Sequence, residues 1–244
     1  MESAALLEPL SVAIHATRRA TIEPGDTAIV FGAGTVGLLT AAMAKVSGAT
    51  TVVIADIDYG RINYALSNGF AHKGYIVTPQ KDSNETAGKL AQAKELSSDI
   101  MQIASLNDPD FEGADVTFDC TGKEICMQAG LYVSLPTFSS NPWLIVMQAT
   151  RPGGQLIMVG MGTPIQTLPM SASHLKEVDI IGIFRYANTY PTGIKLISSG
   201  VLPSLDAMVT HRYHGLASVK EAFELAGKTL DKDGNLVLKV LVET

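Results

Sequence analysis

The sequence predicts an α/β fold with a doubly wound parallel sheet and helices on both faces. Two observations predict this class. Apolar runs alternate with helical patterns along most of the 244 residues, and a glycine-rich turn joins the first such pair. The composition, 46% hydrophobic and 17% charged, is ordinary for a soluble globular domain and allows one large core.

Each element is expected where the periodicity changes. Apolar runs bounded by glycine or polar residues predict strands near residues 28 to 33, 51 to 56, 74 to 77, 115 to 119, 155 to 160 and 179 to 184. Apolar residues three and four apart predict helices over 35 to 47, 59 to 68, 84 to 104, 123 to 132, 191 to 199 and 216 to 227.

Charge and cysteine content exclude several function classes. The net charge of −6 and the pI near 5.3 disfavour a nucleic-acid partner. No apolar run is long enough for a membrane span, and the first 20 residues carry acidic Glu2 and Glu8 in place of a signal peptide. Two cysteines, Cys120 and Cys126, are too few for a disulfide scaffold or a four-thiolate zinc site. We therefore expect a cytoplasmic protein with no membrane or nucleic-acid partner.

The stretch "AIVFGAGTVGLL" carries the clearest binding motif. Gly32 permits a tight turn between strand and helix, Gly34 lets a pyrophosphate approach the backbone, and Gly37 lets the helix pack closely on the strand. The helix N-terminus then faces the anion. Because glycines at strand ends are also common for structural reasons, the motif needs a second signal.

Asp56 supplies that second signal. It ends the apolar strand "TTVVIA", about 20 residues after the glycine motif, where a carboxylate accepts hydrogen bonds from the adenosine ribose of NAD. The structural alternative is a helix N-cap, for which Asp58 competes. We assign the ribose to Asp56 and the cap to Asp58. Together with the glycines, this predicts a Rossmann-type NAD site.

Seven segments in order resemble the zinc-dependent medium-chain dehydrogenases, in their sorbitol, xylitol and arabinitol branch. The matching motifs are "EPLSVAIHATRRA", "FGAGTVGL", "ADIDYGRINYA", "TFDCTG", "QLIMVGMG", "EVDIIGIFRYANTYP" and "VTHRYHGL". The resemblance implies hydride transfer from a secondary alcohol of a small polyol to NAD. It also implies dinucleotide contacts at Val36, Asp56, Arg61, Thr121, Val159, Gly160, Met161, Phe184 and Arg185.

Each of these residues also has a structural explanation. Arg61 is equally typical of a solvated helix position, Val36 of core packing, and Arg185 of a charge that marks the exit of a strand from the sheet. The ordered motifs favour ligand contact, and the resemblance directs Arg185 and Tyr186 toward the polyol.

Zinc is the second cofactor that the resemblance implies, because it polarises the alcohol oxygen in this family. The family takes a Cys and a His–Glu pair from an amino-terminal domain that precedes the segment resembling "ALLEPLSV", and only "MESA" precedes that segment here. Glu8 matches the one carboxylate contributed from this side, as a direct ligand or through water. Its structural alternative is a helix N-cap, with Pro9 in the first turn. His211 and His214 lack a third ligand nearby in sequence, so no complete metal site is assigned.

Residues 133–148, within "AGLYVSLPTFSSNPWLIVMQATRPGG", are expected to be an insert. Without them the fourth predicted helix leads through an Arg151-Pro152-Gly153-Gly154 turn directly into the fifth strand. A real lid or an oligomer contact is one alternative. We favour a retained intron, because Val-Ser can be encoded by a donor-like GTAAGT and the terminal Gln by an acceptor-like CAG.

The chain therefore divides into three parts. Residues 1–20 form a linker helix left from a catalytic domain, 21–204 form the NAD-binding domain, and 205–244 form a carboxy-terminal helix and strand of the partly missing catalytic domain. We expect a homo-oligomer with weak or no activity alone. A non-catalytic dinucleotide-binding or interaction protein, and a dehydrogenase completed by another chain, remain open alternatives.

Overall fold

A computed structural model describes residues 2–79, 85–106, 111–132 and 149–243 of the chain, and it confirms the predicted α/β class. Six parallel strands form the main sheet in the order β3-β2-β1-β4-β5-β6. They are β1 (Thr27–Phe31), β2 (Thr51–Asp56), β3 (Lys73–Ile76), β4 (Ala114–Asp119), β5 (Thr150–Met158) and β6 (Asp179–Gly182). The order reverses direction between β1 and β4, which in open α/β sheets is where ligands bind.

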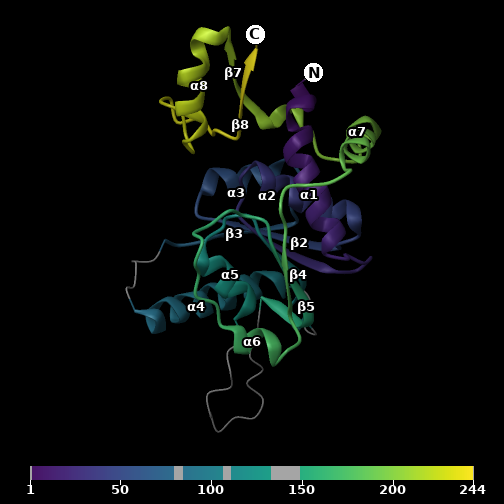
Figure 1. Cartoon of the computed structure of the whole chain (residues 1–244), viewed down its shortest axis with the longest axis vertical. Coiled ribbons are helices and arrows are strands. Elements are labelled where there is room, and N and C mark those ends of the chain that lie inside the picture. Colours follow the sequence, from purple (N-terminus) through teal and green to yellow (C-terminus); the bar gives the residue numbers. More distant parts are fainter. Residues whose placement is uncertain (1, 80–84, 107–110, 133–148, 244) are drawn as a thin grey trace.

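Helices cover both faces of this sheet (Figure 1). One face carries α1 (Leu7–Arg19), α2 (Thr35–Ser47) and α3 (Tyr59–Ser67), and the other carries α4 (Thr86–Ala104) and α5 (Glu124–Leu131). A short 3-10 helix, Glu2–Leu6, leads into α1, and α7 (Tyr190–Ser199) packs against α1. The sheet is thus enclosed on both sides.

The core explains why β1 is apolar from Ala28 to Phe31. Ala28 and Val30 of β1 pack with the α1–α3 side, whereas Ile29 and Phe31 pack with the α4–α5 side. Successive side chains of a strand point to opposite faces, so a strand buried on both faces needs an unbroken apolar run.

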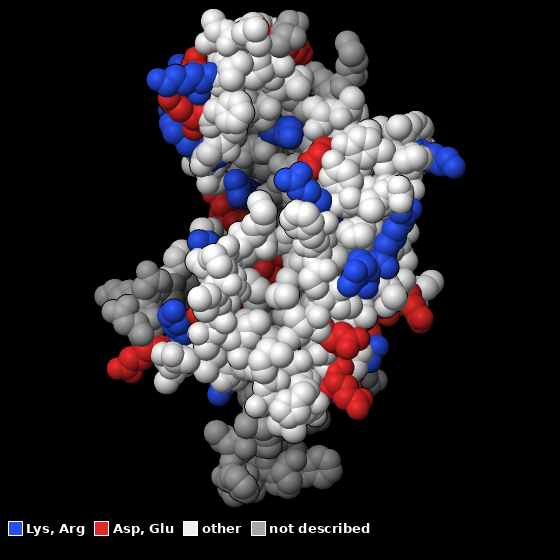
Figure 2. Space-filling model, viewed as in Figure 1, with Lys and Arg blue, Asp and Glu red and all other residues white. Residues whose placement is uncertain are grey.

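A smaller carboxy-terminal unit lies above the sheet (Figure 1). It contains the parallel pair β7 (Val209–His214) and β8 (Lys239–Glu243) together with α8 (Val219–Ala226). Its link to the main body includes a hydrogen bond of 2.9 Å from Thr35 Oγ1, in the first turn of α2, to the Leu238 carbonyl oxygen. Figure 2 shows a hollow between this unit and the main body, with basic side chains beside it.

The fifth strand corrects one expectation. The predicted Arg151–Gly154 turn lies inside β5, which already pairs with β4 at Thr150 opposite Ala114. The register then shifts, and pairing resumes at Gln155 opposite Val116. The extra residues form a bulge, with Gly153 in the left-handed region at φ 70°, because Pro and Gly are tolerated in strands at such irregularities.

The boundaries of the other strands and helices lie closer to those predicted from the sequence. β6 stops at Gly182, two residues earlier than predicted, and the expected helix over 216 to 227 begins as the 3-10 turn Leu216–Ser218. The short α6 (Met170–His174) and β7 were not predicted. The expected insert, 133–148, lies outside the described residues. Among the helices that the structure describes, none has the length and apolar character needed to cross a bilayer.

His72 gives the fold a pH-dependent contact. Its Nδ1 accepts a hydrogen bond of 2.9 Å from the Val52 N–H, so this nitrogen must be unprotonated. Burial lowers the pKa of His72, and the charges of Lys45 and Lys73 lower it further. A histidine whose pKa is lowered on folding contributes stability at pH values above its ordinary pKa. This contribution is lost as the pH falls through the folded-state pKa.

We therefore expect the unfolding free energy of the wild type to decline more steeply than that of His72→Asn as pH falls from about 6.5 to about 5. The difference should stay below about 1 kcal/mol, because the ring is largely exposed and solvent screens its charge. Urea unfolding at a series of pH values measures both slopes. Equal pH slopes of the unfolding free energy for the wild type and His72→Asn would contradict the assigned contact between His72 Nδ1 and the Val52 N–H.

Candidate functional site

The loops that follow five strands are joined at the carboxyl edge of the sheet. Gly32 N–H donates to the Ala55 carbonyl at 2.7 Å, and Cys120 N–H donates to the Phe31 carbonyl at 2.9 Å. Val159 N–H donates to the Asp119 carbonyl and Ile183 N–H donates to the Met158 carbonyl, each at 2.9 Å. Each bond extends the pairing of two strands into their loops. The sequence motifs of these five loops therefore meet at one edge.

The glycine turn after β1 has the geometry that its spacing predicts. Gly32 has φ 96°, a left-handed conformation that favours glycine, and a Cβ there would come within 2.9 Å of Thr121 Cγ2. A Cβ on Gly37 would overlap the Gly32 carbonyl oxygen. Gly34 is the N-cap of α2 with extended backbone, so the amino end of α2 opens directly beside the turn. The arrangement suits an anion at this helix end.

Asp56 lies beside the same turn. Its Oδ2 accepts a hydrogen bond of 2.6 Å from the Ala33 N–H, and its Oδ1 accepts one of 2.9 Å from the Asp58 N–H. Each carboxylate oxygen keeps a further lone pair for a ligand hydroxyl. Asp58 caps α3 by accepting from the Arg61 N–H at 2.9 Å, which confirms the cap role expected for Asp58.

Arg61 lies beside the glycine turn, and Val36 lies in the first turn of α2. The Arg61 Nη1 lies 3.9 Å from the position that a Cβ of Gly34 would occupy. Its Nε is buried and has no hydrogen-bond partner in the structure. Val36 is only partly buried, unlike the core residues Gly37 and Leu38 that follow it in α2. Arg61 is likewise partly buried, so neither side chain is fully solvated or fully enclosed in the core.

The loops after β4 and β5 form the other side of this edge. Thr121 is partly buried, Val159 and Gly160 lie beside Asp119 through backbone bonds, and Met161 projects with 94% of its surface exposed. Burial raises the pKa of Asp119, and hydrogen bonds from Thr121 and Gly122 oppose that shift. Burial also raises the pKa of Cys120 and of Cys126 to about 12, so neither thiol is a ready nucleophile.

A cluster of polar and aromatic side chains follows β6. Phe184 is 81% exposed, and Arg185 has φ 53° with its guanidinium 5.7 Å from the Phe184 ring. The hydroxyls of Tyr186 and Tyr190 lie 3.1 Å apart over stacked rings. This hydrogen bond, together with burial and the charge of Glu8, raises the pKa of Tyr186, while Arg185 opposes the shift.

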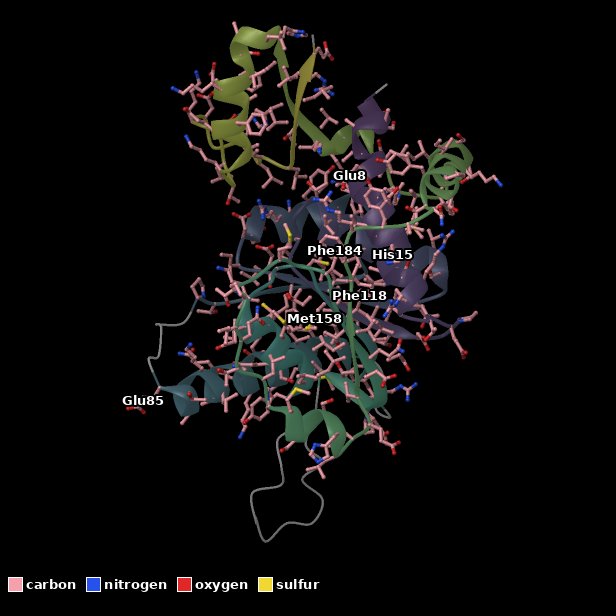
Figure 3. The ribbon with its side chains drawn as sticks, viewed as in Figure 1. Glu8, His15, Glu85, Phe118, Met158 and Phe184 are labelled. Atoms are coloured by element: carbon pink, nitrogen blue, oxygen red, sulfur yellow. The ribbon has the colours of Figure 1, made fainter. Side chains whose placement is uncertain are left out.

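Glu8 belongs to the same region. It lies exposed in the first turn of α1, near Phe184 in Figure 3, and its charge reaches Tyr186. The N-cap explanation does not hold, because the cap position is Leu6 and no side chain caps the helix. The charges of Glu8 and Arg185 thus both reach Tyr186.

The residues present do not fit a zinc site. Within the described ranges, no group of three His, Cys, Asp or Glu side chains is placed to hold a metal. His211 instead contacts Asp231 with 3.2 Å between Nε2 and Oδ2, and His214 contacts Glu243 with 3.2 Å between Nδ1 and Oε2. Both histidines of "THRYHG" are engaged within the carboxy-terminal unit.

A cavity of about 470 Å³ opens on the α4–α5 side of the sheet, and its lining includes side chains of α4 and α5. Ile57, directly after Asp56, lines one wall, and Lys123 and Ile125, at the start of α5, line another. Tyr75 and Asp99 also line it, joined by a hydrogen bond of 2.6 Å. None of these residues was predicted from the sequence. The sequence signal for Ile57 was its place directly after Asp56, whereas its 66% exposure is seen only in the structure.

Comparison with known proteins places this geometry among dehydrogenases. No family model matches the chain. Human sorbitol dehydrogenase is 34% identical over 239 residues, covering 94% of this chain and 54% of the human protein. The structure of 2R,3R-butanediol dehydrogenase from Bacillus subtilis has a TM-score of 0.70 and 25% identity, covering 100% of this chain and 58% of that one.

A third likeness shows the fold alone. An alcohol dehydrogenase from Escherichia coli, solved with NADH, has a TM-score of 0.72 but only 19% identity, covering 100% of this chain and 59% of that one. The fold is thus similar to a segment of the zinc-type medium-chain dehydrogenases. By sequence the chain is a homologue of the sorbitol dehydrogenases. It spans about half the length of the curated relatives it matches.

Proposed function

We propose that this chain is the NAD-binding portion of a polyol dehydrogenase. The observation that carries the proposal is the position of Asp56, whose carboxylate is fixed by two backbone N–H groups beside a turn that side chains would fill. Gly32, Gly34 and Gly37 would admit the pyrophosphate at the amino end of α2, and Asp56 would accept the adenosine ribose hydroxyls.

The two halves of the dinucleotide would lie on opposite sides of this turn. With the adenosine ribose at Asp56, the adenine would enter the cavity beside Ile57, and Arg61 would contact this half from α3. The nicotinamide half would extend over the loops after β4, β5 and β6, past Thr121, Val159, Gly160, Met161, Phe184 and Arg185. NAD supplies the hydride acceptor in such a complex, and these residues would bind and orient it.

The polyol would meet Arg185 and Tyr186. Guanidinium and phenol groups donate hydrogen bonds to substrate hydroxyls, and both side chains follow β6, where the charge of Glu8 reaches Tyr186. Because the described residues do not assemble three metal ligands, we propose that the chain alone is inactive or only weakly active. A dehydrogenase completed by another chain, or a non-catalytic NAD-binding protein, would share the same site.

Cofactor choice tests the role of Asp56. A carboxylate at this position repels the 2′-phosphate of NADP, so we expect NAD to bind at least about tenfold more tightly than NADP, a difference of about 1.4 kcal/mol. Asp56→Asn should bring the affinities for NAD and NADP closer together, because it removes the negative charge that repels the 2′-phosphate. Calorimetric titration of both nucleotides measures it.

The matched control for this titration is Glu112→Gln. It removes one negative charge just before β4, at the opposite edge of the sheet, and should leave the ratio unchanged. Equal affinities of the wild type for the two nucleotides would remove the ribose assignment of Asp56.

Turnover tests the proposed low activity. Purified chain with excess zinc, NAD and a panel of polyols should form NADH at no more than a trace rate, because bound NAD alone does not ionise the alcohol. The assay follows NADH absorbance, with Glu8→Ala alongside. Robust turnover that Glu8→Ala abolishes would show that a complete metal site forms, and would overturn the proposal.

We also propose that the chain self-associates. In the described part of the sheet β6 pairs only with β5, which leaves a parallel-sheet edge open, and Leu216 and Phe223 of the carboxy-terminal unit are each 75% exposed. Light scattering at micromolar concentration should detect dimers or larger species. A stable monomer would count against this assembly.

A further inference from the structure

Asp119, the last residue of β4, is a buried carboxylate at the centre of the carboxyl edge. It is 0% exposed, and its side chain accepts three hydrogen bonds from the loop that follows it. The donors are the Thr121 N–H at 3.0 Å, the Thr121 hydroxyl at 2.5 Å and the Gly122 N–H at 3.0 Å. A buried carboxylate is costly unless its lone pairs are satisfied, so this loop must keep the conformation that supplies these donors.

The backbone of Asp119 holds a second loop. Its carbonyl oxygen accepts the Val159 N–H at 2.9 Å and the Gly160 N–H at 2.8 Å, both from the loop after β5. One residue therefore fixes loop 120–122 through its side chain and the start of loop 159–162 through its main chain.

The two loops are in direct backbone contact. A Cβ on Gly122 would overlap the Met161 carbonyl group, and a Cβ on Gly160 would overlap the Gly122 nitrogen. Such close approach leaves no room for either loop to shift alone. The orientation of Gly122 therefore determines where the exposed Met161 stands.

We propose that Asp119 is a positioning residue for the nicotinamide half of the cofactor, acting through this pair of interlocked loops. The inference rests on the proposed NAD site, where Thr121, Val159, Gly160 and Met161 form the wall beside the nicotinamide half. Asp119 contacts no ligand itself. It sets the wall by holding Thr121 and Gly122, while Asp56 serves the adenosine half from the other side of β1.

The neutral amide cannot replace the carboxylate. In Asp119→Asn the side-chain oxygen accepts as before, but the NH₂ group is left facing an N–H or O–H donor of the same loop. The substitution keeps volume and burial, so it perturbs the loop while preserving the packing of β4. Asp115→Asn is the matched control, because Asp115 lies at the other end of β4 and also accepts a backbone N–H, from Thr27 at 2.7 Å.

The experiment compares the affinities of two probes, NADH and AMP, by calorimetry on the full chain. Asp119→Asn should weaken NADH binding by about tenfold or more and change AMP binding by less than about twofold, because AMP reports only the adenosine half. Asp115→Asn should leave the ratio of the two affinities unchanged. A purely structural role of Asp119 would weaken both probes equally.

A milder variant covers the case in which Asp119→Asn does not fold. Thr121→Val removes only the hydroxyl donor, and it should lower NADH affinity by about threefold with AMP unchanged. Hydrogen exchange without ligand should show faster exchange of the Gly122 and Gly160 amides in either variant.

The outcomes separate the two proposals. Wild-type protein that binds neither NADH nor AMP would overturn the proposed function, and the cofactor role of Asp119 with it. Wild-type binding of NADH that Asp119→Asn leaves unchanged, or reduces in step with AMP, would overturn the positioning role alone.

Discussion

The parallel pairing of β1 with β2 and β4 is the constraint on which the site depends. In this register Phe31, the last residue of β1, lies opposite Ala55 on one side and Asp119 on the other. Because parallel strands all end at the same edge, the loops after β1, β2 and β4 begin at the same level, and backbone bonds join them there. A one-residue slip would also turn each buried strand side chain to the opposite face, so the apolar core enforces the alignment.

The polar groups at this edge are held by backbone N–H groups rather than by other charges. Asp56 accepts from Ala33 and Asp58, and Asp119 accepts from Thr121 and Gly122. Hydrogen bonds to N–H groups hold a carboxylate firmly while leaving its charge uncompensated. In the proposed complex the Asp56 carboxylate would accept hydrogen bonds from the ribose hydroxyls, whereas the Asp119 carboxylate accepts hydrogen bonds from its own loop and fixes the conformation of that loop. Two aspartates at the ends of β2 and β4, the strands on either side of β1, thus differ in their surroundings, because one is partly exposed and the other is fully buried.

Local sequence signals predicted the elements that their own residues specify. The capping role of Asp58 follows from an acceptor side chain three residues before the N–H it binds, and the turn at Gly32 follows from the need for a left-handed conformation. The bulge at Arg151–Gly154 could not be predicted this way. Pro and Gly signal a turn by themselves, and only the pairing of Thr150 with Ala114 keeps them inside β5.

The sequence by itself determined the alternation of strands and helices, the glycine turn and the candidate ligand residues, because these depend on periodicity and on the conformational range of single residues. Only the tertiary structure decided which of them meet. In the folded chain Arg61 lies beside Gly34, and Ile57 lines one wall of a cavity. His211 contacts Asp231, and His214 contacts Glu243. The tertiary structure also buried Asp119 under two loops far apart in the chain. Such contacts arise from packing between distant segments, and the spacing of residues along the chain does not contain them.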